Sequence, residues 1–119
     1  MIDKIPAGNS FSVKGRIWLE TVKGPFLGYG RVELLRKIKE YGSISQAAKS
    51  MGIAYRHAWH LIDSMNSKAE TPLVTTQSGG KGGGGAVVTQ FGEKAISEFD
   101  DLERRFRKFL ESESNKFQI

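Results

Sequence analysis

The chain is 119 residues long, a length that suits one small domain with a modest core. Lys and Arg outnumber Asp and Glu by 18 to 13, and the net charge of +5 favours an anionic partner, although a solvated basic face would also account for it. The absence of cysteine excludes disulfide frameworks and thiolate metal sites. The first residues lack the apolar segment of a secretory signal, and no apolar run is long enough to span a membrane, so we expect a cytoplasmic protein.

The N-terminal part combines a strand pattern with a basic bias. Residues 1–10 predict a flexible arm, and residues 11–22 alternate between apolar and polar side chains, which is typical of a strand with one half-buried face. Residues 23–30 contain three glycines and a proline, a composition typical of a loop. The basic excess lies in residues 1–53, which hold nine basic and four acidic side chains. It includes a group around the first helices, namely Arg31, Arg36, Lys37, Lys39 and Lys49.

Residues 31–66 predict three helices, each with apolar residues at helical spacing, and a glycine follows each of the first two. Ser43 and Gln46 form the pattern of a capping box at the start of the second helix. The third helix is expected to begin near Ala54. A helix pair joined by a glycine-containing turn is typical of a helix-turn-helix, although an ordinary helical hairpin would show the same pattern.

The third helix is apolar on one side, and its opposite side carries the polar residues that a recognition helix would turn to the major groove. Arg56 and His57 lie in the first turn, where recognition helices contact base edges, and Arg56 could pair with guanine O6 and N7. His60, one turn further on, could reach a base or a phosphate. His57, His60 and Asp63 also have a spacing that could hold a metal, but there is no obvious fourth ligand, and we expect no metal site.

Two short β-branched segments, residues 73–77 and 86–89, predict strands on either side of the glycine-rich sequence SGGKGGGG. A ribbon directly after a helix-turn-helix is typical of the wing of a winged helix domain, although a merely flexible hairpin would fit the composition. The glycines match the G-x-G-x-x-G pattern of dinucleotide sites, but a strand rather than a helix follows them, and the P-loop pattern also fails. A tip without bulky side chains would let backbone amides approach phosphate, with Lys81 supplying charge and Ser78 a hydroxyl.

Residues 90–111 predict a long helix capped by Thr89. Its apolar residues are spaced 4, 3, 4 and 3 apart, which is close to the period of a coiled-coil seam. We interpret this stripe as a dimerisation surface, because its three phenylalanines are hard to cover in so small a monomer. The alternative is a helix packed on its own domain. The stripe consists of Ala95, Phe99, Leu102, Phe106 and Phe109.

The stretch GSISQAAKSMGIAYRHAW, followed by LVTTQSGGKGGGGAVVTQFG, resembles the DNA-binding domain of ModE-type molybdate-dependent transcriptional regulators, which is related to the LysR-type winged helix-turn-helix. The resemblance covers residues 12–110, and the GGKGGGGA wing is its most specific part. It implies a winged helix dimer that binds operator DNA through Tyr55 and Arg56 and through the wing residues 79–85, with Lys81. The C-terminal molybdate-binding domains of the family would begin where this chain stops, and we expect no molybdate binding by this chain.

The sequence therefore predicts a mainly α fold with a small β-ribbon, a winged helix-turn-helix with a long C-terminal dimerisation helix. We expect the flexible arm over residues 1–10, the DNA-binding domain over 11–89, the dimerisation helix over 90–112 and a frayed tail over 113–119. The expected function is a sequence-specific transcriptional regulator that binds double-stranded DNA as a homodimer without a cofactor. A winged-helix protein-interaction module without an operator of its own is the alternative.

Catalysis is not expected, because the chain has no cysteine nucleophile and no obvious serine, histidine and aspartate constellation. The candidate site is instead a set of DNA-binding residues at the start of the two helices of the helix-turn-helix and at the wing tip. These residues are Ser43, Ser45, Gln46, Tyr55, Arg56, His57, His60, Ser78, Gly79, Gly80, Lys81, Gly82 and Gly83.

Overall fold

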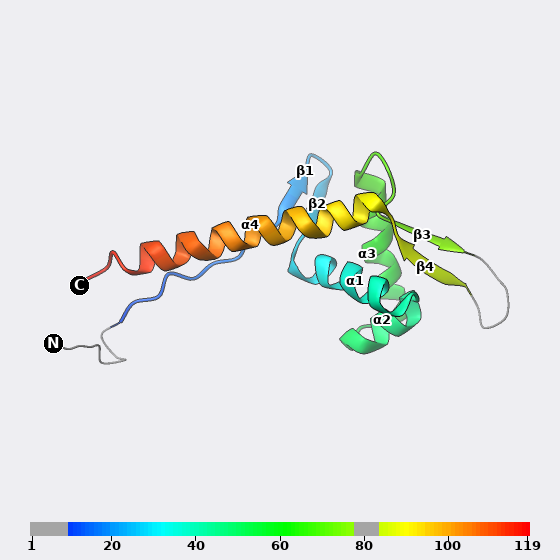
Figure 1. Cartoon of the computed structure of the whole chain (residues 1–119), viewed down its shortest axis with the longest axis horizontal. Coiled ribbons are helices and arrows are strands. Elements are labelled where there is room, and N and C mark those ends of the chain that lie inside the picture. The colour runs from blue at the N-terminus through cyan, green and yellow to red at the C-terminus, as the bar shows by residue number, and fades with distance from the viewer. Residues whose placement is uncertain (1–9, 78–83) are drawn as a thin grey trace. The chain divides into compact units, whose positions relative to one another are not determined.

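The computed structural model describes residues 10–77 and 84–119, and within this part it has the predicted mainly α fold with a small β-ribbon (Figure 1). Three helices and the ribbon form a winged helix-turn-helix, and a long helix follows them. The chain divides into two compact units. One unit is Trp18–Asp100, and the second unit combines the described residues up to Ile17 with Asp101–Ile119. The elements are, in chain order, β1 (Leu19–Thr21), β2 (Gly24–Leu27), α1 (Tyr29–Tyr41), α2 (Ile44–Met51), α3 (Tyr55–Lys68), β3 (Val74–Gln77), β4 (Gly85–Val88) and α4 (Gln90–Ser114).

The core of the Trp18–Asp100 unit lies between α1, α2 and α3, and each helix buries the side that its sequence period marks as apolar. The buried residues of α2 include Ala47 and Ala48, whose small side chains let the neighbouring helices come close. Burying one large aliphatic side chain contributes roughly 1.5–3 kcal/mol, so this core supplies most of the favourable free energy of folding. The largest fully buried side chains are Val32, Leu34, Leu35, Ile38, Ile62 and Met65.

Two glycines end helices in the left-handed conformation that the sequence predicts. Gly42 follows α1 with φ 67°, and Gly52 follows α2 with φ 69°. Between them, Ser43 Oγ accepts a hydrogen bond from the Gln46 backbone amide at 3.2 Å, which satisfies an otherwise unpaired donor at the start of α2. The carbonyl oxygen of Gly42 also accepts a hydrogen bond from the Ala86 amide at 3.0 Å, so the end of α1 is joined to β4.

The strands β3 and β4 pair antiparallel, from Val74 opposite Val88 to Gln77 opposite Gly85, which confirms the predicted ribbon. Thr89 caps α4 as expected, because its hydroxyl oxygen accepts a hydrogen bond from the Gly92 amide at 3.1 Å. The first turn of α4 passes so close to the base of the ribbon that a Cβ on Gly92 would collide with the Leu73 carbonyl and the Val88 side chain. The ribbon and α4 therefore share one tightly packed junction.

The predicted strand over residues 11–22 and the predicted loop over residues 23–30 are both wrong in part. Only Leu19–Thr21 is a strand, and it pairs with a second strand, Gly24–Leu27, inside the expected loop. The cause is a tight turn, in which Gly24 takes a φ of 121° that favours glycine and the Thr21 hydroxyl oxygen accepts a hydrogen bond from the Lys23 amide. α1 consequently begins at Tyr29, two residues earlier than expected.

The second unit consists of an extended N-terminal segment packed along the C-terminal part of α4. The Phe11 and Phe117 rings lie 6.4 Å apart, and the Val13 amide donates a hydrogen bond to Ser114 Oγ at 2.7 Å. Gly15 is so near Phe106 that a Cβ on it would come within 3.3 Å of the ring. Residues 11–17, whose alternating apolar and polar side chains predict a strand, therefore pack against a helix and do not form part of a sheet.

We predict that Gly92→Ala lowers the free energy of unfolding by roughly 1–3 kcal/mol, because the added methyl group overpacks the junction between the ribbon and α4. Helix propensity alone predicts the opposite sign, since alanine is about 1 kcal/mol better than glycine in a helix. Urea unfolding followed by circular dichroism measures the change.

Gly30→Ala is the matched control, because Gly30 also lies in the first turn of a helix and a Cβ there has no atom within 4 Å. We expect this variant to be unchanged or more stable by up to about 1 kcal/mol. Equal effects of the two substitutions would contradict the close contact at Gly92.

Candidate nucleic-acid interface

The exposed side of α3 carries the polar residues that the sequence assigns to base contacts. Ala58, Ile62 and Met65 close the opposite side of the helix against the core. Because α3 begins at Tyr55, Arg56 falls in its first turn, and it is exposed together with His57, His60 and Asp63. The arrangement leaves one polar arc of the helix open to a partner.

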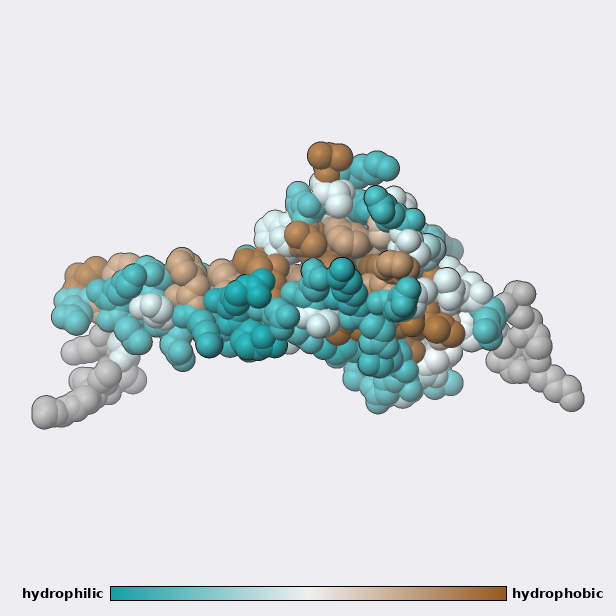
Figure 2. All heavy atoms as spheres, turned by 45° about the horizontal axis from the view of Figure 1, so that its top comes forward, coloured by the Kyte–Doolittle hydropathy of each residue, from teal (hydrophilic) through white to brown (hydrophobic). Residues whose placement is uncertain are grey.

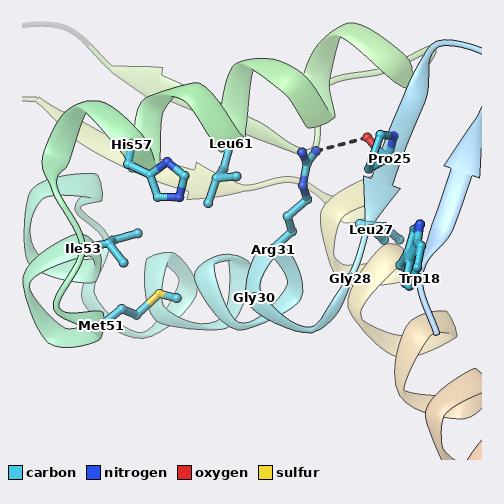
Figure 3. A pocket seen from close by; sticks show the side chains of 10 residues that line it. All are labelled: Trp18, Pro25, Leu27, Gly28, Gly30, Arg31, Met51, Ile53, His57 and Leu61. Atoms are coloured by element: carbon cyan, nitrogen blue, oxygen red, sulfur yellow. Dashed lines mark hydrogen bonds between the residues drawn. The ribbon is translucent and has the colours of Figure 1, made fainter. Parts of the chain in front are cut away.

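The two histidines lie close together on this arc. The imidazole rings of His57 and His60 are 6.5 Å apart and nearly parallel, with an interplanar angle of 17°. His57 lies toward one flank of α3, where it borders an apolar cavity that also includes Leu61 (Figure 3). Among the described residues, no three His, Asp or Glu side chains are grouped as a metal ion would require.

A cavity of about 240 Å³ lies on the other flank of α3, between the start of α2 and the ribbon. Tyr55 and Trp59 form one wall and contact each other edge to face, with ring centroids 6.4 Å apart. The predicted residue Gln46 is exposed in the first turn of α2. Hydroxyl and amide groups from the start of α2 and from β3 line the remaining walls, namely Ser43, Ser45, Thr76 and Gln77.

The predicted wing-tip residues lie outside the residues that the structure describes. The described ribbon ends with Gln77 paired to Gly85, and Gly84 continues toward the tip. The described ends Gln77 and Gly84 both line the polar cavity, together with Tyr55 at the beginning of α3. The residues concerned are Ser78, Gly79, Gly80, Lys81, Gly82 and Gly83.

The sequence analysis missed Asn66, whose side chain ties α3 to β3. Asn66 Nδ2 donates a hydrogen bond to the Val74 carbonyl oxygen at 3.0 Å. Its Oδ1 accepts hydrogen bonds from the amides of Leu73 at 2.8 Å and Val74 at 3.3 Å. No motif or spacing indicates this role. The partners of Asn66 are backbone groups of Leu73 and Val74, and only the fold of the chain after α3 brings them near the side chain.

The basic residues of α1 are largely paired with carboxylates, so the basic bias of residues 1–53 is a poor guide to the interface. Arg36 makes a two-pronged hydrogen-bonded ion pair with Asp100, and that hydrogen bond is the main cause that raises the pKa of Arg36. Lys39 pairs with Glu93 at 2.9 Å. Within residues 10–77 and 84–119, exposed Lys49 and Arg56 have no ion-pair partner, which leaves their charge available.

The predicted dimerisation stripe is divided between two environments. In the Trp18–Asp100 unit, Ala95 is half-buried and Phe99 is only 3% exposed, so Phe99 is already buried in the monomer. In the second unit, Leu102 and Phe106 are half-buried and Phe109 is 55% exposed. Hydrophobic side chains lie along one edge of the C-terminal part of α4, with hydrophilic side chains along the other (Figure 2).

We predict that Asn66→Asp lowers the free energy of unfolding by roughly 1–3 kcal/mol. The carboxylate would keep the acceptor for Leu73 and Val74 but would lose the donor and oppose the Val74 carbonyl. Urea unfolding measures the loss. Ser67→Ala, one residue further on in the same helix at an exposed position, should change the free energy by less than about 0.5 kcal/mol, and an equal loss there would refute a special role for Asn66.

Comparison with known proteins gives a consistent family. A model of the bacterial regulatory helix-turn-helix proteins of the lysR family matches residues 30–93. The molybdenum-pterin-binding protein MopB of Rhodobacter capsulatus is 44% identical over 89 residues, which are 75% of this chain and 33% of MopB. The dual regulator ModE of Escherichia coli K12 is 50% identical over 72 residues, or 60% of this chain and 28% of ModE.

A third relative matches a larger share of the chain. The molybdenum transport protein ModE of Azotobacter vinelandii is 37% identical over 101 residues, which are 85% of this chain and 37% of that protein. The matched region therefore spans about a third of the length of these relatives. In the described part of the chain, no helix has the length and apolar character that crossing a lipid bilayer requires.

Proposed function

This chain belongs to the lysR family of bacterial regulatory helix-turn-helix proteins, with a DNA-binding domain of the ModE type, and we propose that it is a sequence-specific regulator of transcription. The family consists of DNA-binding regulators and not of enzymes. The observation that carries the proposal is the exposed polar arc of α3, in which Arg56 has no ion-pair partner among the described residues.

In this proposal α3 is the recognition helix and enters the major groove. Arg56 lies in the first turn, where a guanidinium group can donate two hydrogen bonds to guanine O6 and N7. His60 follows one turn later on the same exposed arc and reaches a base or a phosphate, and His57 contributes from the flank. Tyr55 lies at the start of the helix, beside the polar cavity, and contacts the DNA backbone.

The polar cavity and the wing hold the phosphate backbone. Ser43 and Ser45 lie at the start of α2, where the unpaired backbone amides and the helix dipole favour a negative group. Gln46 is exposed in the same turn and adds an amide donor. The glycine-rich tip adds backbone amides without bulky side chains, and Lys81 adds a charge. These contacts position the protein on DNA without reading its sequence.

We further propose that the protein acts as a homodimer through its second unit. Phe109 is exposed there, and Phe11 and Phe117 are also partly exposed, so the monomer leaves an apolar surface around the end of α4. A two-fold dimer places two recognition helices about 34 Å apart, which matches half-sites one turn of DNA apart or a multiple of that. Burying several phenylalanines, at roughly 1.5–3 kcal/mol each, offsets the entropy of association.

We propose no molybdate site in this chain. Its relatives are named for molybdenum pterin binding, molybdenum transport and regulation, but the match covers only about a third of each. The helix-turn-helix family model covers residues 30–93 of this chain, and we assign to the chain none of the residues that give the relatives their molybdenum names. The rival function is a winged-helix module that binds a protein, and it predicts no affinity for any duplex.

We predict that Arg56→Ala weakens binding to a selected operator by roughly 1–3 kcal/mol and has little effect on random DNA, because a base contact carries sequence information. Lys81→Ala should weaken both DNAs to a similar extent and reduce the salt dependence of binding by about one ion, because a phosphate contact does not depend on sequence. Fluorescence anisotropy with a duplex chosen from random DNA measures both effects over a range of salt concentrations.

The control is Lys94→Ala, which removes an exposed lysine of α4 that is paired with Glu98. This variant should bind both duplexes as the wild type does. If Arg56→Ala weakens specific and random DNA equally, Arg56 is only a phosphate contact. If the wild type binds no duplex at low salt, including the selected pool, the protein-interaction module is the better function.

We predict that the wild type has twice the chain mass of 13.2 kDa in solution and that Phe109→Asp halves the observed mass. The substitution puts a charge on an apolar surface that is already exposed in the monomer, so the fold should persist. Light scattering at micromolar concentration measures the mass. Val22→Asp is the matched control, because Val22 is a fully exposed apolar residue in the turn between β1 and β2, and a wild-type mass near 13.2 kDa would remove the dimer.

A further inference from the structure

A second and larger cavity, of about 440 Å³, lies on the flank of α3 opposite the polar cavity (Figure 3). It is bounded by α3, by the start of α1, by the turn between α2 and α3, and by the hairpin of β1 and β2. Its volume falls within the range of small-molecule pockets, roughly 300–1,000 Å³. Most of its walls are apolar, and the side chains that form them are Trp18, Leu27, Met51, Ile53 and Leu61.

Arg31 brings the one permanent charge among the residues that line this cavity. Its side chain rises from α1 toward α3 beside Leu61, and Nη1 donates hydrogen bonds to the Pro25 carbonyl oxygen at 3.2 Å and to Ser64 Oγ at 2.8 Å (Figure 3). Both acceptors are neutral. Within residues 10–77 and 84–119, no carboxylate pairs with Arg31, whereas Arg36 of the same helix pairs with Asp100. Burial lowers the pKa of the Arg31 guanidinium, because the charge is desolvated.

A second cation converges on the same neutral oxygen. Lys68 Nζ also donates a hydrogen bond to Ser64 Oγ, at 2.8 Å, and in the described part of the chain it too lacks a carboxylate partner. Two positive groups that share one hydroxyl oxygen repel each other, and partial burial strengthens that repulsion. An anion at this position would relieve the repulsion and use the guanidinium N–H groups that Pro25 and Ser64 leave free.

We propose that this cavity binds a small amphipathic carboxylate, with the carboxylate near Arg31 and Lys68 and the apolar body against Trp18 and Leu61. The apolar walls favour a hydrocarbon body, and they disfavour a strongly hydrated dianion, which would have to lose more water to enter. The planar carboxylate matches the geometry of the guanidinium group, which can donate two parallel hydrogen bonds.

Ligand binding in this cavity would also affect DNA binding, and this part of the inference rests on the proposed function. Met51 borders the cavity from the end of α2, Ile53 borders it from the turn before α3, and His57 borders it from the proposed recognition helix. A ligand that contacts both elements would favour one orientation of α3, so its binding and the binding of DNA would be coupled. Such coupling is reciprocal, and each ligand changes the affinity for the other by the same factor.

The test uses 3-cyclohexylpropionate as the probe and its primary amide as the neutral match, with no DNA present. In the Trp59→Phe background the fluorescence of Trp18 reports on the cavity wall, and amide chemical shifts of Gly28, Gly30 and Leu61 report on its rim. We expect saturable changes in both, with the carboxylate bound at least about tenfold more tightly than the amide. Arg31→Met should remove this preference, and Arg36→Met, on the same helix, should leave it intact.

Gly30→Leu keeps the test decisive if Arg31→Met does not fold. Gly30 lines the cavity and a Cβ there meets no atom within 4 Å, so a leucine side chain has room to fill the space and should abolish binding of both probes. Equal affinity for the carboxylate and the amide, or no saturable change at millimolar concentration, would overturn the proposal.

Two further results would assign the cavity to a macromolecule and overturn the proposal in the same way. The first is a shift of the same amides with protein concentration alone, which would indicate a second copy. The second is a loss of DNA affinity in Arg31→Met without any binding of the probe, which would make Arg31 a backbone contact. Because probe binding is measured without DNA, its failure leaves the proposed function standing, and a failure to bind DNA leaves the probe result standing.

Discussion

The packing of α3 against the core through Ala58, Ile62 and Met65 is the constraint on which the rest of the interface depends. Once that side of the helix is buried, the rotation of about 100° per residue fixes the direction in which every other side chain of α3 points. One flank carries Asn66 and Trp59 toward the ribbon and the polar cavity. The other flank faces the apolar cavity and Arg31, and only the arc between the two flanks stays open. The open arc is therefore defined by what is buried and not by its own polarity.

Ion pairing between α1 and α4 decides which basic residues remain available. Arg36 and Lys39 are engaged by Asp100 and Glu93, so the surface they occupy has little net charge despite its basic sequence. Exposed pairs of this kind contribute only about 0–1 kcal/mol each to stability. Their larger effect is on availability, because Lys49 and Arg56 have no ion-pair partner among the described residues and keep their charge free for an anionic partner.

Local sequence patterns predict most of the fold because their causes are local. The helix ends at Gly42 and Gly52 require only a residue that tolerates positive φ, and the Ser43 cap requires only its own helix. Strand β2 could not be predicted in the same way, because it depends on the turn at Gly24 and on a partner strand of three residues.

The roles of Asn66 and Arg31 were beyond sequence reasoning for a related reason. The acceptors of Asn66 are backbone groups of β3, and one acceptor of Arg31 is a hydroxyl on α3. Neither residue type at its position has a preferred partner that a spacing rule could name. Only the structure shows which cations have a carboxylate partner. It pairs Arg36 with Asp100, a residue 64 positions away in the sequence, and it gives Arg31 no carboxylate partner among the described residues.

The apolar stripe of α4 has one regular spacing, but some of its residues are buried in the monomer and others are exposed. A spacing of about 3.5 residues predicts a seam along one side of a helix, but it does not say which neighbour covers each residue. Phe99 is buried in the monomer, so a charge placed there would disrupt the fold before it could disrupt an assembly. Phe109 is exposed, and the same charge placed there costs the monomer little. The proposed dimer seam therefore uses the part of the stripe beyond Phe99, in the unit that α4 shares with the N-terminal segment.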